Sequence, residues 1–352
     1  MLLFILYSLA SISVFILLHN FFYQKAKYFK INKANQKAVR WSSQKKPVAG
    51  GITFFLSFLF ASTFFLLSQP ISNNLIKIEY LFISISLIFV FFIGLADDML
   101  SISPNLKLFL QIIVALILIY SGLYINIFDN IFLNYAITII WYVGMMNSIN
   151  MLDNMDAIST VVSVSILLGF IFMNVFYFHN LFELLILLGL FYALITFLIF
   201  NFHPAKMYMG DNGSLFLGLF LAIFGVKYIW NHSIYEYNQW TNLLPFLYIL
   251  LFFLIPIADT TTVTINRILE KKSPFTGGKD HTTHALYYIG LSENKIAILL
   301  FLLNLIGVII ATYFLYTGNL NKSLVIISFF YSIFVVLFLY INAFRVNRKN
   351  KK

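Results

Sequence analysis

Residues 80–98 read YLFISISLIFVFFIGLADD, a run of seventeen uncharged, mainly apolar residues that ends in two adjacent aspartates. A helix needs about 20 such residues to cross the hydrocarbon core of a bilayer, and a somewhat shorter run is still sufficient. The run therefore predicts a membrane-spanning helix that carries Asp97 and Asp98 to one aqueous surface.

The composition of the whole chain supports a membrane protein. Of 352 residues, 61% are hydrophobic and only 10% are charged, whereas a soluble domain carries about 45–50% apolar and about 25% charged residues. A soluble globular enzyme is excluded, and so is a disordered or fibrous chain. The absence of cysteine excludes disulfides, thiolate metal sites and a cysteine nucleophile. The net charge of +10 suits loops that face anionic lipid better than a nucleic-acid surface.

Apolar runs of spanning length recur along the chain. We expect an all-α polytopic membrane protein with eleven spans, folded as a single domain over residues 1–352. The expected spans are Leu2–Phe22, Gly50–Leu67, Tyr80–Ala96, Leu106–Leu123, Ile131–Met146, Ile158–Phe178, Leu181–Phe200, Gly213–Tyr228, Leu243–Ala258, Ile296–Leu315 and Leu324–Phe344.

Lysine and arginine gather in alternate loops. One side receives the basic residues of 25–46 and of the tail 345–352, whereas the other side has little beyond Lys77 and Lys322. Because basic loops stay in the cytoplasm, we expect the N-terminus outside and the C-terminus in the cytoplasm.

The same alternation puts six aspartates from four separate helix ends on the cytoplasmic side. Carboxylates at membrane depth are expensive and usually functional, so this convergence predicts a reaction centre facing the cytoplasm. The six are Asp97, Asp98, Asp153, Asp156, Asp211 and Asp259.

Three of these acids have neighbours that indicate a cation. Asp97 and Asp98 repel each other unless a divalent cation or a lysine neutralises them. If residues 147–153 are helical, Asn147, Asn150 and Asp153 share one face, and their oxygens suit Mg²⁺. The alternative is an Asn-rich turn in which Asp156 is the N-cap of the following helix.

Residues 201–214 read NFHPAKMYMGDNGS and join two expected spans. Pro204 and Gly210 end helices, and Asp211 either caps the next helix or holds a metal. Tyr208 is either an interfacial anchor or a platform on which a base stacks.

Two further segments carry cationic side chains. His281 and His284 follow a glycine-bearing loop with basic residues, which fits a diphosphate cradle better than zinc, because no third or fourth zinc ligand lies nearby. A solvated loop that binds lipid headgroups is the alternative for Lys271 and Lys272. Lys46 precedes the second span and either anchors it or reaches a phosphate.

In their order and sidedness these segments resemble the polyprenyl-phosphate N-acetylhexosamine-1-phosphate transferases, in the branch that uses a UDP-N-acetylhexosamine. The likeness runs from about Lys45 to His284. It rests on five blocks, at residues 47–51, 97–98, 147–156, 201–211 and 277–284.

The resemblance implies that Asn150 and Asp211 bind Mg²⁺, with Mn²⁺ as the alternative ion. It further implies that Asp97 and Asp98 position or deprotonate a lipid phosphate, and that Asp153 is a polar acid of the active site.

The resemblance also implies a set of substrate-binding residues. Tyr208 would stack on uracil, and Asn201 and Asp156 would contact the base. The remaining implied residues are Lys46, Lys206, His281 and His284.

The implied substrates are undecaprenyl phosphate and a UDP-N-acetylhexosamine, most directly UDP-GlcNAc. The implied location is the bacterial inner membrane, where the product would start cell-envelope polysaccharide synthesis. The lipid bilayer and a second copy in a homodimer are the other partners, and no nucleic acid is expected.

The sequence departs from the family pattern at two points. The usual Asp-Gly-x-Asp-Gly reads Asp153-Asn154-Met155-Asp156-Ala157, and no arginine follows the last histidine of residues 281–284. The alternatives are phospho-MurNAc-pentapeptide transfer, an inactive protein of the same fold, and an ion-coupled transporter. A transporter would usually hold its acids near the midplane.

Overall fold

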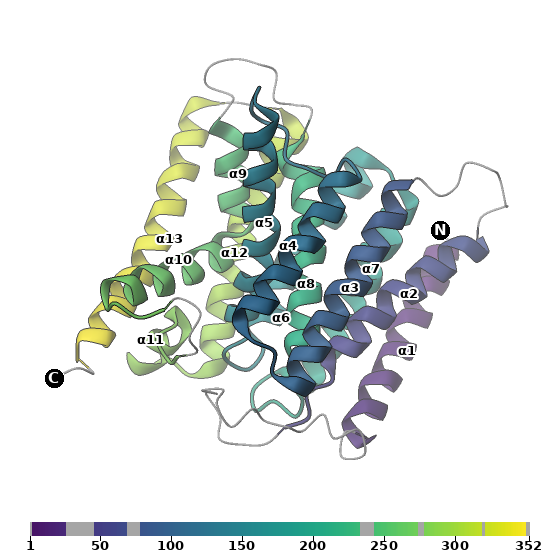
Figure 1. Ribbon diagram of the computed structural model, residues 1–352, viewed down its shortest axis with the longest axis horizontal. Helices are drawn as coiled ribbons and strands as arrows, with labels where there is room; N and C mark the ends of the chain where they lie inside the picture. The colour runs from purple at the N-terminus through teal and green to yellow at the C-terminus, as the bar shows by residue number, and fades with distance from the viewer. Residues whose placement is uncertain are drawn as a thin grey trace.

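The computed structural model describes residues 2–25, 46–68, 78–232, 243–273, 278–318 and 321–349 (Figure 1). Regular structure within these residues is helical, and their one β-bridge joins Val48 and Tyr208. The helices are α1 Leu2–Lys25, α2 Gly50–Ser68, α3 Ile78–Leu100, α4 Pro104–Tyr120, α5 Ile131–Leu152, α6 Ile158–Met173, α7 Leu181–Asn201, α8 Asp211–Gly225, α9 Leu244–Phe252, α10 Leu254–Leu269, α11 Thr282–Tyr288, α12 Glu293–Thr317 and α13 Lys322–Lys349, with π-helical turns η1 Asn174–Phe178 and η2 Val226–Trp230.

The expected class, an all-α multi-pass membrane protein, is confirmed. Nine helices in the described residues are long and apolar enough to cross a membrane, the bent pair α9 and α10 makes a tenth, and α4 is a shorter apolar helix. In Figure 1 the C-terminal ends of α1 and α13 both lie at the lower end of the bundle. The basic residues of 26–45 and Lys77 lie outside the described residues, and which face is cytoplasmic stays a prediction.

Helix α8 is the centre of the bundle. Of an apolar 18-residue stretch within the span Asp211–Trp230, which α8 and η2 form together, 94% is buried, against 22% for the spans of α1 and α13. Helix α8 packs against α2, α3, α5 and α6. The first residue of α8, Asp211, therefore emerges among the lower ends of α3 and α5.

Glycines let three backbones meet at this end of α8. A Cβ on Gly51 of α2 would lie 2.3 Å from Gly213 Cα, and a Cβ on Gly94 of α3 would lie 2.5 Å from Asn212 Cα. Any side chain would force these helices apart, so the glycines fix the distance between the Asp97-Asp98 pair and α8.

The ninth expected span, Leu243–Ala258, contains a sharp bend that was not predicted from the sequence. The helix breaks at Phe253, and α9 and α10 meet at 91°. Pro256 has no backbone N–H to offer the carbonyl of Phe252 four residues earlier. Asn304 of α12 replaces it, because its Nδ2 donates to Phe252 O (3.1 Å) and its Oδ1 accepts from Ile255 N (3.1 Å).

A second charged cluster lies at the opposite, upper end of the bundle. Lys227 contacts both Glu79 and Glu183, and the hydroxyls of Tyr80 and Tyr228 donate to Glu183. Since Lys227 attracts both carboxylates, the cluster holds α3, α7 and η2 together.

Candidate active site

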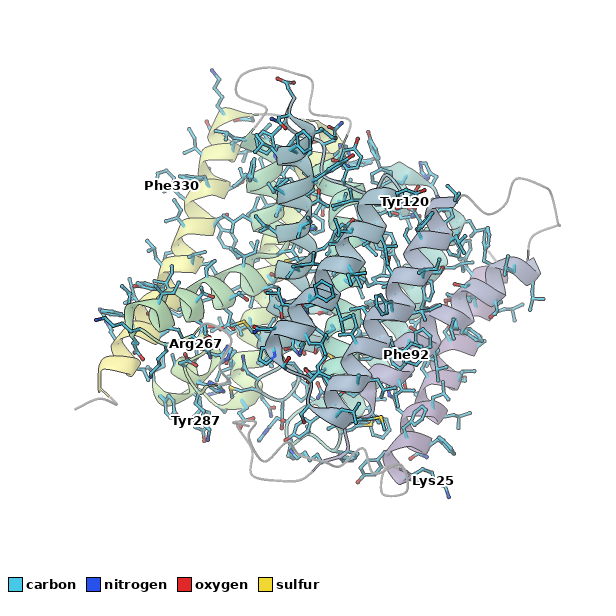
Figure 2. All side chains as sticks on the ribbon, viewed as in Figure 1. Lys25, Phe92, Tyr120, Arg267, Tyr287 and Phe330 are labelled. Atoms are coloured by element: carbon cyan, nitrogen blue, oxygen red, sulfur yellow. The ribbon has the colours of Figure 1, made fainter. Side chains whose placement is uncertain are left out.

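Lys107 joins two of the predicted acids at the lower end of the bundle, the end at which Figure 2 labels Lys25 and Tyr287. Its Nζ lies 2.8 Å from Asp97 Oδ2 and 2.5 Å from Asp211 Oδ2. Carboxylate oxygens from α3 and α8 thus converge on one cationic position.

The start of α4 places this lysine. Ser103 caps the helix, with Oγ accepting from Leu106 N, and Pro104 occupies the first turn. Lys107 lies in the first turn, and its side chain is only 13% exposed. The sequence left open whether a cation or a lysine neutralises the aspartate pair, and it gave no role in the site to Lys107.

Asp98 binds the N-terminus of α8. Its carboxylate accepts from the backbone N–H groups of Asp211 and Asn212, both at 3.0 Å, and from Asn212 Nδ2 at 2.6 Å. The N-cap itself is Gly210, which has no side chain. The expectation that Asp211 caps this helix is therefore wrong. Asp98, on α3, accepts hydrogen bonds from the first N–H groups of α8. The carboxylate of Asp211 faces Lys107 instead.

Asn150 adjoins the same cluster. Its Nδ2 donates to Ser214 Oγ at 2.8 Å, in the first turn of the helix that Asp211 begins. Asn147, one turn earlier, pairs instead with Gln111 of α4 at 2.8 Å. Helix α5 ends at Leu152, so the expected helical face includes Asn147 and Asn150 but stops before Asp153.

Asp153 is the C-cap residue that follows α5, and its Oδ1 accepts from Ser159 Oγ at 2.8 Å. Asp156 is not the N-cap of the next helix, as one interpretation had it. Ala157 is the N-cap, in the left-handed conformation with φ +66°, and makes no side-chain capping bond.

The loop after α7 pairs with the segment before α2. Tyr208 N donates to Pro47 O (2.8 Å), and Ala49 N donates to Tyr208 O (3.2 Å). This pairing sets Lys46 Nζ 5.2 Å from the centre of the Tyr208 ring, within cation–π range. The predicted base platform and a predicted phosphate-binding lysine therefore adjoin each other.

Asp156 lies beside that platform and is 6% exposed. Its Oδ2 accepts from Ala205 N at 2.9 Å and from His203 Nδ1 at 3.0 Å, and Lys46 Nζ lies 3.7 Å away. His203 Nδ1 also lies 2.9 Å from Glu293 Oε2 of α12.

In the described residues, Asp156, His203 and Glu293 form a group of three side chains that could offer ligands to a metal. The chain's own donors already occupy the oxygen of Asp156 that faces His203, and the ammonium of Lys46 lies beside it. Such surroundings favour a hydrogen-bonded network over a cation.

Asn201 is buried, and both the oxygen and the nitrogen of its side-chain amide form hydrogen bonds within the chain. Thr160 Oγ1 donates to Oδ1 (2.8 Å), and Nδ2 donates to Met207 O (3.1 Å). Asn201 thus shapes the loop that carries Tyr208, whereas Lys206 is exposed. The contacts of these residues with a substrate stay predictions.

The histidine segment packs against α10. Fully buried Asp259 contacts His281 Nδ1 (2.8 Å) and accepts from Thr282 N (2.9 Å) and Thr282 Oγ1 (2.6 Å). The ring of His284 lies 5.4 Å from that of His281. Burial, assisted by the charge of His281, lowers the pKa of His284 to about 4, so His284 is neutral at physiological pH.

Two contacts attach this segment to its surroundings. Thr283 Oγ1 donates to Asn154 Oδ1 at 2.6 Å, which brings the segment beside the loop after α5. Arg267 donates to both oxygens of Asp280, each at 2.8 Å. Although burial alone would raise the pKa of Asp280, these bonds and the charge of Arg267 outweigh it and hold the pKa below its ordinary value.

Replacing Ala157 by glycine is expected to stabilise the protein. A left-handed conformation costs a residue with a Cβ about 1–2 kcal/mol, and the loss of one buried methyl offsets part of that gain. We expect a net gain of up to about 1 kcal/mol, measured as the melting temperature in detergent. The matched control is Ala136→Gly on the exposed face of α5, which should destabilise because glycine is a poor helix former. A lower melting temperature for both variants would contradict the strain at Ala157.

Comparisons with known proteins find relatives with a sequence similar to this chain. Residues 80–229 match the model of the family described as glycosyl transferase family 4. The chain is 28% identical over 279 residues to the probable undecaprenyl-phosphate N-acetylglucosaminyl 1-phosphate transferase of Bacillus subtilis, covering 77% of this chain and 74% of that protein.

Two other relatives carry related names. The undecaprenyl-phosphate alpha-N-acetylglucosaminyl 1-phosphate transferase of Thermotoga maritima is 26% identical over 281 residues, 77% of this chain and 79% of that protein. The phospho-N-acetylmuramoyl-pentapeptide-transferase of Streptococcus uberis is 37% identical over 205 residues, but these cover only 51% of this chain and 58% of that protein.

Proposed function

We propose that this chain, whose residues 80–229 match the model of glycosyl transferase family 4, transfers GlcNAc-1-phosphate from UDP-GlcNAc to undecaprenyl phosphate on the cytoplasmic face of a bacterial inner membrane. The observation that carries the proposal is the convergence of Asp97, Lys107 and Asp211 at the ends of three helices. An isoprenoid tail is too apolar to leave the bilayer and a nucleotide too charged to enter it, so their reaction requires this location.

Asn150 and Asp211 are the proposed ligands of Mg²⁺. The fit rests on the chemistry of the donors, which are amide and carboxylate oxygens of the kind that hard divalent cations prefer. It also rests on the cationic position between Asp97 and Asp211, which the ammonium of Lys107 marks. When bound, the ion would offset the negative charge of the diphosphate.

The proposed reaction is a single displacement. A phosphate oxygen of the lipid attacks the β-phosphorus of UDP-GlcNAc, a new P–O bond forms, and the bond to UMP breaks with its electron pair on the UMP oxygen. Because a phosphate monoester has a second pKa near 6, the nucleophile is already ionised at neutral pH. The protein therefore has to align the two phosphates and offset their repulsion. Lys107 is suited to hold the lipid phosphate, and Asp97 to orient Lys107.

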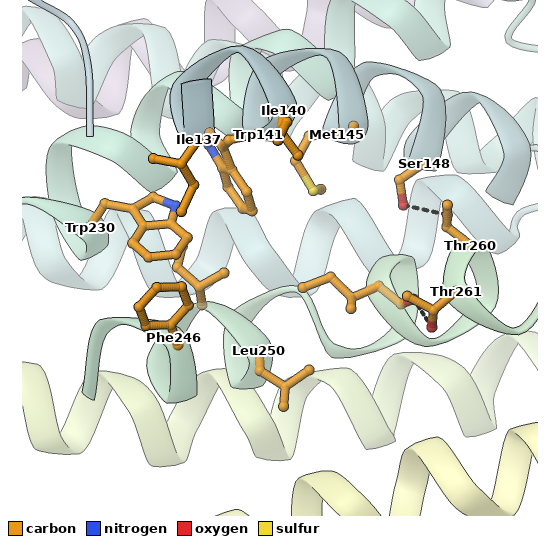
Figure 3. A pocket seen from close by; sticks show the side chains of 13 residues that line it. Ile137, Ile140, Trp141, Met145, Ser148, Trp230, Phe246, Leu250, Thr260 and Thr261 are labelled. Carbon is orange, nitrogen blue, oxygen red and sulfur yellow. Dashed lines mark hydrogen bonds between the residues drawn. The ribbon is translucent and has the colours of Figure 1, made fainter. Parts of the chain in front are cut away.

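The proposed binding site of the lipid tail is an apolar cavity of about 460 Å³ (Figure 3). Helix α5, η2 and the bent pair α9 and α10 supply its walls. Trp141 and Trp230 lie at one end, whereas Ser148 and Thr260, joined by a 2.8 Å hydrogen bond, lie at the other. Ser148 faces α10, whereas Asn150, two residues later, faces α8, so α5 lies between the polar end of the cavity and the proposed metal ligands.

The test is release of UMP by the purified protein in detergent. UDP-GlcNAc with undecaprenyl phosphate should yield UMP and the lipid diphosphate sugar, EDTA should abolish the reaction, and added Mg²⁺ should restore it. Transfer from UDP-MurNAc-pentapeptide in place of UDP-GlcNAc would favour the alternative that the Streptococcus relative's name suggests. Substrate flux through proteoliposomes without UMP release would instead indicate a transporter.

A further inference from the structure

We propose that His203 is a positioning residue for nucleobase recognition: held between Asp156 and Glu293, it fixes the Asp156 carboxylate beside the Lys46–Tyr208 platform and ties that platform to α12. The proposal rests on the proposed function, because it assumes that a uridine nucleotide binds there.

The first step is the environment of Asp156. A carboxylate that is 6% exposed needs partners to offset its loss of hydration. Its Oδ2 has three partners, the backbone N–H of Ala205 (2.9 Å), Nδ1 of His203 (3.0 Å) and Nζ of Lys46 (3.7 Å). Of these, His203 is the side chain in hydrogen-bonding contact, so its removal would leave the carboxylate free to rotate about the backbone contact.

The second step is the position of Glu293. Two carboxylates whose ligand atoms lie within 4.8 Å of each other repel. The N–H of the imidazole, 3.0 Å from one and 2.9 Å from the other, offsets this repulsion. Glu293 is the first residue of α12, where the helix dipole favours a negative charge. His203 therefore joins two anions that would separate without it.

The third step is the link to the rest of the site. Only residues 289–292 separate α12 from α11, whose first residues pack on Asp259 through His281 and Thr282. The contact of His203 with Glu293 thus connects the loop that carries Tyr208 to the segment that carries the predicted diphosphate histidines. Base binding and diphosphate binding would then share one rigid frame.

A fixed carboxylate at this place suits uracil. Uracil presents an N3–H donor between two carbonyl acceptors, whereas N3 of cytosine is an acceptor that a carboxylate repels. Asp156 would accept from N3–H, and the ammonium of Lys46 lies close enough to serve a carbonyl. Sites built to hydrogen-bond a particular donor reject analogues that lack it by large factors, provided that the acceptor is held in place.

The experiment compares His203→Phe with His203→Asn. The phenylalanine ring keeps the bulk but donates no hydrogen bond, whereas the amide nitrogen of asparagine stands near the position of Nδ1. We expect His203→Phe to raise KM for UDP-GlcNAc at least tenfold with kcat within threefold of wild type, and to reduce the preference for UMP over CMP in calorimetric binding by a similar factor. His203→Asn should recover most of both. His179→Asn, in the turn before α7, is the matched control and should change neither.

The possible results separate the two proposals. Loss of kcat at unchanged KM, an unchanged preference for UMP over CMP, or no recovery in a folded His203→Asn variant would overturn the role of His203. If wild type binds UMP but transfers no sugar phosphate, the proposed function fails while the binding comparison still tests His203. If wild type binds neither nucleotide, the inference fails outright.

Discussion

Asp211→Asn should abolish UMP release while the protein stays folded. The substitution keeps the size of the side chain but removes the negative charge that faces Lys107 Nζ at 2.5 Å. It also replaces a carboxylate, which hard divalent cations bind well, with a neutral amide. Loss of one group that stabilises developing charge costs about 10²–10³ in rate. Because a metal ligand and a charge are lost together, we expect a drop of at least about a thousandfold, or about 4 kcal/mol in the barrier.

Two measurements separate this effect from misfolding. Mg²⁺ should raise the melting temperature of wild type in detergent and should no longer do so for Asp211→Asn, since ligands stabilise the state they bind. Asp129→Asn, in the exposed loop between α4 and α5, is the control and should behave as wild type in both assays. Near-normal turnover by Asp211→Asn would contradict the metal assignment.

The helices could be predicted because the bilayer imposes their length. A span must cover a fixed thickness of hydrocarbon, so runs such as residues 80–96 are visible in the sequence without knowledge of their neighbours. Breaks within a span are harder to predict. The bend at Phe253 depends on Pro256 and also on Asn304, which compensates the carbonyl of Phe252 from 52 residues along the chain. Hydropathy contains no information about that partner.

In the candidate site, too, one part could be predicted from the sequence and another could not. Residue types and sidedness bring Asp97, Asp98 and Asp211 to one end, and the structure brings them together there. The use of each carboxylate was not predictable, because it depends on which donor lies opposite. Asp98 faces the free N–H groups of α8, whereas Asp97 faces Lys107.

Contacts between segments far apart in the chain were the hardest to predict from the sequence. His203 and Glu293 are separated by ninety positions, and nothing in either local sequence indicates the other. Ala157 is different, because the pattern that the sequence resembles has a glycine at this position, and a glycine there indicates the positive φ that the structure shows. The alanine keeps that conformation at the cost of strain.

Lys107→Met is the second substitution for which we expect a large effect. Methionine keeps much of the apolar length of the side chain but removes the charge between Asp97 and Asp211. Breaking a buried ion pair on one side costs about 3–5 kcal/mol, because the remaining charges stay unpaired. Asp211 is 33% exposed, so water screens part of this loss, and we expect the free energy of unfolding to fall by about 2 kcal/mol.

The response of this variant to Mg²⁺ distinguishes a structural from a substrate-binding role of Lys107. If the ammonium only neutralises Asp97 and Asp211, a divalent cation can replace it, and high Mg²⁺ should restore both the melting temperature and UMP release. If Lys107 also holds the lipid phosphate, Mg²⁺ should restore the melting temperature while UMP release stays at least about a hundredfold below wild type, since no ligand replaces that contact. We expect the second result. Lys295→Met, exposed in the first turn of α12, provides the matched loss of a lysine and should leave both measurements unchanged. Full recovery of UMP release by Lys107→Met in Mg²⁺ would confine Lys107 to charge balance and assign the lipid phosphate to another cation.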